Sequence, residues 1–68
     1  MNSIIDSAIK LLPYYLLNLS FLDLKKETIW ENIPFMVKRE YLLRNFDNFS
    51  EFDKNKIKQN IVELHNKD

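Results

Sequence analysis

The sequence predicts an all-α fold, a compact bundle of three to four short helices in a single domain spanning residues 1–68. Three observations favour this class. No stretch sustains the period-two alternation of a half-buried strand, and no Asn-Gly type hairpin turn occurs. Apolar residues recur instead at helical spacing, and serines stand three residues before aspartates in the manner of helix N-caps. Glycine is absent, so tight turns that need positive φ must use Asn or Asp.

The first predicted helix begins at Ser3 and carries a broad apolar arc at 100° per residue. Pro13 is expected to kink or break it, because proline lacks a backbone N–H and clashes with the preceding turn. If the helix continues beyond Pro13, the arc forms one core-facing side. Its members are Ile4, Ile5, Ala8, Ile9, Leu11, Leu12, Tyr15, Leu16, Leu19 and Leu22.

Further helix signals follow in order along the chain. A serine-aspartate cap predicts a second segment over about residues 20–32. Pro34 suits the first turn of a helix that reaches about Phe46, and the residue before a proline avoids the helical region, so a boundary is expected there. Ser50 is expected to cap the last helix, over about residues 50–66.

Composition argues against several function classes. Without glycine there is no phosphate-cradling loop, and without cysteine there is neither a disulfide nor a thiolate nucleophile. His65 is the single histidine, so no metal site, no cofactor, no catalytic residue and no small-molecule substrate are expected. A domain this small buries little of its surface, and association with another chain is the remaining common means of stabilising it. We therefore expect a protein that is not an enzyme.

Charge and hydropathy indicate where in the cell the protein is expected. Ten Lys and Arg residues balance ten Asp and Glu residues, so the chain has no net attraction for nucleic acid or anionic membrane. The longest uncharged stretch, residues 11–22, is too short for a transmembrane span, which needs about 20 residues. The N-terminus lacks the basic region of a secretory signal. We expect the cytoplasm of a cell or of an infected host.

One candidate binding surface is aromatic. Tyr14, Leu17 and Phe21 are spaced i, i+3, i+7 on the side opposite the apolar arc. They are either additional core or an exposed patch that docks another protein or a second copy in a homo-oligomer, since aromatics are favoured at interface centres. Trp30 and Phe35 are further anchor candidates.

Arg39 is the remaining candidate for partner binding. On a helix from Pro34 it falls near the middle of an apolar arc that includes Phe35 and Leu42. A buried unpaired guanidinium is strongly unfavourable, so Arg39 must extend to solvent, pair with an acid, or face a partner.

A basic surface is the alternative. Lys54 and Lys58 share one side of the last helix, and Lys38 and Arg44 extend this surface if the two helices are adjacent. Neighbouring acids dilute its field, and the chain as a whole is neutral, so nucleic acid is the less favoured partner.

Together these features predict a small non-enzymatic protein-binding module, that is, an adaptor, a stoichiometric inhibitor or an assembly subunit. It would act through an apolar and aromatic helical surface. An origin in a phage or mobile element fits the size and the lack of catalytic groups by analogy only. The alternative is a small helical nucleic-acid-binding regulator that uses the Lys54 and Lys58 face. No motif is specific enough to assign a family.

Overall fold

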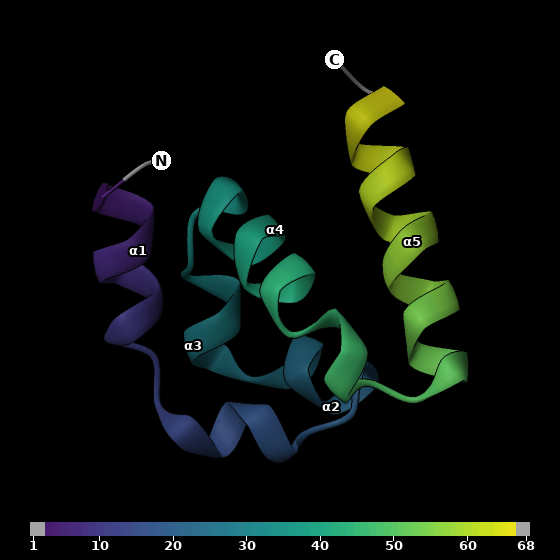
Figure 1. Cartoon of the computed structure of the whole chain (residues 1–68), viewed down its shortest axis with the longest axis horizontal. Helices are drawn as coiled ribbons and strands as arrows, with labels where there is room; N and C mark the ends of the chain where they lie inside the picture. Colours follow the sequence, from purple (N-terminus) through teal and green to yellow (C-terminus); the bar gives the residue numbers. More distant parts are fainter. Residues whose placement is uncertain (1–2, 67–68) are drawn as a thin grey trace.

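The chain folds as an all-α bundle in a computed structural model that describes residues 3–66, with side chains described for residues 4–60 (Figure 1). The predicted fold class is confirmed, and the described residues contain no strand. The five α-helices and two 3₁₀ turns are α1 (Ser3–Lys10), η1 (Tyr14–Asn18), α2 (Phe21–Lys26), α3 (Thr28–Glu31), α4 (Phe35–Arg44), η2 (Phe46–Asn48) and α5 (Glu51–Asn66). Within this part of the chain, no helix is long and apolar enough to cross a membrane.

The first predicted helix is broken at Pro13, as expected. α1 ends at Lys10, and the amides of Leu11 and Leu12 close it by donating to the carbonyls of Ala8 and Ile9 at 3.2 and 3.1 Å. Pro13 is extended, with φ −63° and ψ 140°, and the short 3₁₀ turn η1 follows it. The missing proline N–H and the extended preference of the preceding residue explain why the α-helix does not resume.

The predicted serine caps of α2 and α5 are also present. The Ser20 hydroxyl accepts from the amide of Asp23 at 3.2 Å, and the Ser50 hydroxyl accepts from the amide of Asp53 at 3.1 Å. The segment expected over residues 20–32 is divided in two, because Glu27 is extended between α2 and α3, with φ −73° and ψ 131°.

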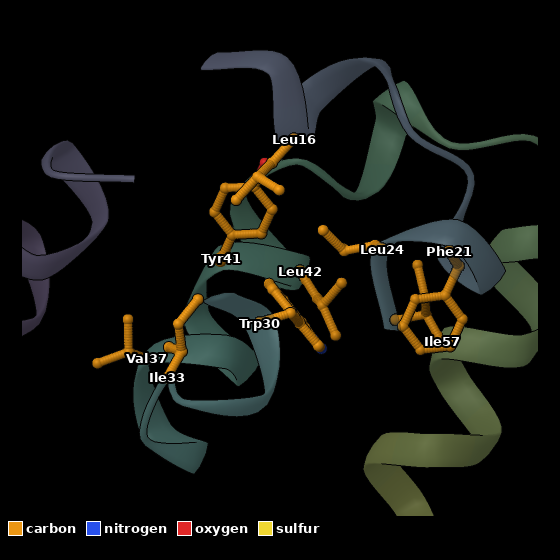
Figure 2. Close-up of a cluster of buried hydrophobic side chains, with 9 residues drawn as sticks. All are labelled: Leu16, Phe21, Leu24, Trp30, Ile33, Val37, Tyr41, Leu42 and Ile57. Atoms are coloured by element: carbon orange, nitrogen blue, oxygen red, sulfur yellow. The ribbon is translucent and has the colours of Figure 1, made fainter. Parts of the chain in front are cut away.

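The hydrophobic core lies among α2, α3, α4 and the first half of α5, and η1 covers one side of it (Figure 2). Leu16, Leu24 and Ile57 have almost no exposed surface. Helix α1 contributes only partly buried side chains, such as Ile5 and Ile9, which pack against the core from outside. The buried hydrophobic residues are Leu16, Phe21, Leu24, Trp30, Ile33, Val37, Tyr41, Leu42 and Ile57.

The single core-facing arc expected along residues 4–22 is wrong for four of its members. Ile4, Leu11, Tyr15 and Leu22 are exposed. For Leu11, Tyr15 and Leu22 the reason is that a 100° spacing has meaning only on a continuous α-helix, and the chain leaves α-helical geometry after Lys10. Ile4 lies within α1, which packs against the core from outside.

Helices α1 and α5 flank α4 on opposite sides (Figure 1). Arg44 of α4 donates a hydrogen bond to the carboxylate of Asp6 and so ties α1 to α4. At the other side, the Asp53 carboxylate of α5 accepts from the amide of Phe21 at the start of α2, at 3.1 Å. Beyond this contact the C-terminal half of α5 stands apart from α4 (Figure 1). Each flanking helix therefore has a polar contact with an element distant in sequence, beside the apolar contacts that Ile5 and Ile9 of α1 and Ile57 of α5 make with the core.

Candidate protein-binding groove

The six side chains predicted to bind a partner line two separate hollows in the surface. The first, which we call the basic groove, has a volume of about 430 Å³ and includes four of them, Phe21, Trp30, Phe35 and Arg39. The second, the tyrosine hollow, has a volume of about 530 Å³ and includes the other two, Tyr14 and Leu17. The basic groove is lined by Phe21, Lys25, Trp30, Glu31, Phe35, Lys38, Arg39, Leu42 and Asn60. The tyrosine hollow is lined by Ile9, Lys10, Leu12, Pro13, Tyr14, Leu17, Tyr41 and Asn45.

The stripe of Tyr14, Leu17 and Phe21 expected on one helix does not form. Tyr14 and Leu17 are exposed on η1, whereas Phe21 is 3% exposed and belongs to the core. Leu19 and Ser20 between them are extended, with ψ of 146° and 164°, which interrupts the helical spacing. Phe21 is therefore a core residue. Tyr14 and Leu17 are exposed and remain available to a partner.

The floor of the basic groove is the outer edge of the core. Phe21, Trp30 and Leu42 are buried and still line the groove. Trp30 packs edge to face against Tyr41 on its inner side, with ring centroids 5.6 Å apart and planes at 66°. Trp30 is thus packed within the core rather than projecting as a free anchor, and it also lines the groove.

One face of α4 forms a wall of the groove. Phe35, Lys38, Arg39 and Leu42 are spaced i, i+3, i+4, i+7, which places them on a single helical face. Phe35 is 40% exposed, a large apolar ring open to solvent. Arg39 lies between Phe35 and Leu42 on this face and lines the groove with them.

The charges around the groove are mainly positive. Lys25, Lys38 and Arg39 line it, against the single carboxylate of Glu31. None of the three cations forms an ion pair in the described part of the chain. Lys25 lies over the ring of Phe21, with Nζ 4.7 Å from the centroid, a cation–π contact that leaves its charge free to meet an anion. The groove therefore combines an apolar floor with a cationic rim.

The sequence does not predict the tertiary contact of Asp53, an acidic residue of α5. Asp53 follows Ser50 at cap spacing, and the sequence predicts only this local role. In the structure its buried carboxylate also accepts from the amide of Phe21, a residue that lines the groove. No sequence signal links these two residues, which are 32 positions apart.

The four residues of the predicted nucleic-acid face do not gather on one surface. Lys38 lines the basic groove, while Arg44 is paired with Asp6 and lies 4.0 Å from Glu40. A separate group, Lys54 and Lys58, surrounds the ring of Phe46.

The charge of Lys54 is also partly offset. Its Nζ lies 3.5 Å from Glu51 and 3.9 Å from Asp47. The side chain of His65 lies outside the described residues.

One residue that lines the tyrosine hollow carries a buried hydroxyl without a hydrogen-bond partner in the described structure. Tyr41 lines the hollow yet is only 4% exposed, and its hydroxyl has no hydrogen-bond partner among the described residues. Burial raises the pKa of Tyr41 above its ordinary value of 10.0. A buried hydroxyl without a partner is uncommon in folded proteins.

The arrangement of both hollows is suited to binding by contact. Among the described residues no group of three or more His, Cys, Asp or Glu side chains could hold a metal ion. The basic groove offers apolar surface and positive charge, and the tyrosine hollow offers mainly apolar surface. No protein-family model matches the chain, and comparison with curated proteins and with solved structures finds no match to either.

Proposed function

We propose that this chain is a small non-enzymatic protein-binding module whose basic groove takes an acidic segment of a partner protein. The observation that carries this proposal is the α4 face, where the exposed ring of Phe35 stands beside Lys38 and Arg39, two cations without ion pairs in the described structure. Apolar floor and cationic rim together favour a segment with one large apolar side chain flanked by carboxylates.

The two parts of the groove make different contributions to binding. Burial of apolar surface contributes favourably, at about 25 cal/mol per Å² of area removed from water, and the entropic cost of association is subtracted from it. Phe35 contributes most of the newly buried area, because Phe21, Trp30 and Leu42 are already largely covered. The rim cations select an acidic partner and speed its encounter, an effect that salt screens.

Arg39 is the most specific group of this site. Its planar guanidinium can bind a carboxylate through two parallel hydrogen bonds, which an ammonium group does not do. The position of Arg39 between Phe35 and Leu42 brings this donor next to the apolar surface that would hold the anchor side chain. Binding of this kind occupies a partner's surface without turnover, as an adaptor, inhibitor or assembly subunit does.

A random peptide library displayed on phage tests this proposal. Selection against the full chain is expected to enrich peptides in which aspartate or glutamate flanks a large apolar residue. The selected peptides should lose binding to Arg39→Glu and retain it with Lys56→Glu, a matched charge reversal at an exposed lysine outside the groove. Enrichment of basic or neutral peptides, no enrichment, or equal loss in both variants would overturn the proposal.

The nucleic-acid alternative is an outcome of a parallel test. The assay measures gel retardation of a mixed-sequence duplex or of a single-stranded RNA at low salt. Retardation that is abolished by Lys54→Glu with Lys58→Glu and retained in Arg39→Glu would identify the surface of Lys54 and Lys58 around Phe46 as the functional site in place of the groove. The proposal predicts no shift at low salt.

A further inference from the structure

Every residue that lines the basic groove belongs to an α-helix. Lys25 of α2, Trp30 of α3, Arg39 of α4 and Asn60 of α5 are examples, so four helices contribute side chains to one hollow. Its volume of about 430 Å³ falls within the range of about 300–1,000 Å³ that is usual for ligand pockets. The groove therefore has room for more than one side chain of a partner segment.

The groove offers little to the backbone of an extended peptide. The described residues contain no strand, so there is no sheet edge on which a peptide could add a strand of its own. Among the side chains that line the groove, only those of Glu31 and Asn60 can accept a hydrogen bond. An extended segment would therefore bury backbone N–H groups without enough acceptors, which is strongly unfavourable.

We propose that the segment which occupies the basic groove is an acidic amphipathic helix of the partner protein. A helix pairs its own backbone N–H and C=O groups, so it can bury one face in the groove without leaving them unbonded. Amphipathic helices that lay an apolar face into an apolar groove are a recurring mode of recognition. This inference rests on the proposed function, because it takes the acidic segment from there and adds its conformation.

The α4 wall sets the spacing of the side chains that such a helix presents. Phe35 and Arg39 are four residues apart, about 6 Å along the axis at 1.5 Å per residue, and Leu42 follows three residues later. A partner helix that lies along α4 in either direction repeats these distances. It would therefore carry two apolar residues seven positions apart, for contact with Phe35 and Leu42, and between them a carboxylate that pairs with Arg39.

The charges of the groove select an acidic helix over a basic one. Lys38 and Arg39 are half-buried, and neither they nor Lys25 form an ion pair in the described part of the chain. Glu31 is the single carboxylate among the residues that line the groove. Carboxylates beside the apolar face of the partner helix would therefore meet unpaired cations, whereas a basic helix would meet like charges.

Two dye-labelled synthetic peptides of equal length and net charge test the helix, with fluorescence anisotropy measuring their binding to the full chain. Both carry phenylalanine and leucine seven positions apart with glutamate between them. In the first, a lysine-to-glutamate lactam bridge on the opposite face holds the helix. In the second, acetyl-lysine and glutamine replace the bridge, and a central proline breaks the helix. The bridged peptide should bind about tenfold more tightly or better, because its helix is already formed.

Variants of the chain and of the peptide separate this inference from the proposed function. Arg39→Glu should weaken binding of the bridged peptide about tenfold or more, and Lys56→Glu should leave it unchanged. Equal or tighter binding of the proline peptide would overturn the helix and keep the acidic groove. If neither peptide binds, or if glutamine in place of the central glutamate leaves the affinity unchanged, the proposed function fails and the inference fails with it.

Discussion

The buried carboxylate of Asp53 accepts a hydrogen bond from the backbone amide of Phe21, across 32 positions of sequence. The amide belongs to the first residue of α2, where backbone N–H groups have no partner within the helix. Asp53 in α5 therefore caps α2 from outside, next to the serine cap that Ser20 supplies locally. This contact helps to place α5 against α2 and so bears on the width of the basic groove.

Removal of this carboxylate is expected to destabilise the fold. Asp53→Ala leaves the Phe21 amide buried without its acceptor, which should lower the free energy of unfolding by about 1–3 kcal/mol. Asp53→Asn keeps an acceptor oxygen and should lower it less. Urea denaturation measures the change, with Asn55→Ala, at an exposed position of α5, as the control. Equal stability of Asp53→Ala and the control would show that the contact contributes nothing.

Leu24 and Leu22 offer a matched test of the core within α2. Leu24 is fully buried, and its replacement by alanine should lower the free energy of unfolding by about 2–5 kcal/mol. Leu22 is exposed, and the same truncation there should change it by less than about 0.5 kcal/mol.

A chain of this length has a total stability of only about 3–10 kcal/mol, so Leu24→Ala is expected to remove a large fraction of it. Ile57→Val keeps the core test measurable, with an expected loss of about 0.5–1.5 kcal/mol in urea denaturation. Similar losses for Leu24→Ala and Leu22→Ala would contradict the assignment of the core.

Tyr41→Phe should stabilise the monomer, by about 1 kcal/mol, because it removes a hydroxyl that is buried without a partner in the described structure. It should also change the response to alkali. Burial raises the pKa of Tyr41 above its ordinary value of 10.0, so the folded state favours the neutral phenol. That contribution is complete below pH 10, the ordinary value, and is lost as the pH rises through the folded-state pKa.

Thermal unfolding of dilute protein at neutral and alkaline pH measures both effects. The variant should lose less stability above pH 10 than the wild type. Tyr15→Phe is the comparison variant. In the wild type the exposed Tyr15 hydroxyl donates a hydrogen bond to Glu27 at 2.6 Å, and this bond, rather than burial, is the main cause that raises the pKa of Tyr15. A destabilised Tyr41→Phe would mean that the hydroxyl has a partner in solution.

Much of the fold could be predicted from the sequence, because the residues that begin or end these helices act on backbone groups only a few positions away. Pro13 lacks a donor wherever it stands, and Ser20 and Ser50 each cap a helix through an amide three residues away. The break at Glu27 has no such signal, since neither glycine nor proline is near.

The site was predicted less completely, for a related reason. Phe35 and Arg39 share a face of one predicted helix, so their grouping could be read from spacing. Phe21 could not be assigned to core or surface, because that depends on where η1 ends and on the position of α5. The division of the six residues between two hollows is a tertiary property.

Trp30, the single tryptophan of the chain, lines the basic groove, so its fluorescence reports on the groove directly. We would titrate the full chain with a synthetic peptide in which phenylalanine and leucine are flanked by aspartate and glutamate, and with the same peptide carrying asparagine and glutamine instead. A saturable change in fluorescence is expected with the acidic peptide, and salt should weaken the binding. Affinity should fall about tenfold or more in Arg39→Glu and stay unchanged in Lys56→Glu. No saturable change, or equal affinity for the two peptides, would contradict binding of an acidic segment in the groove.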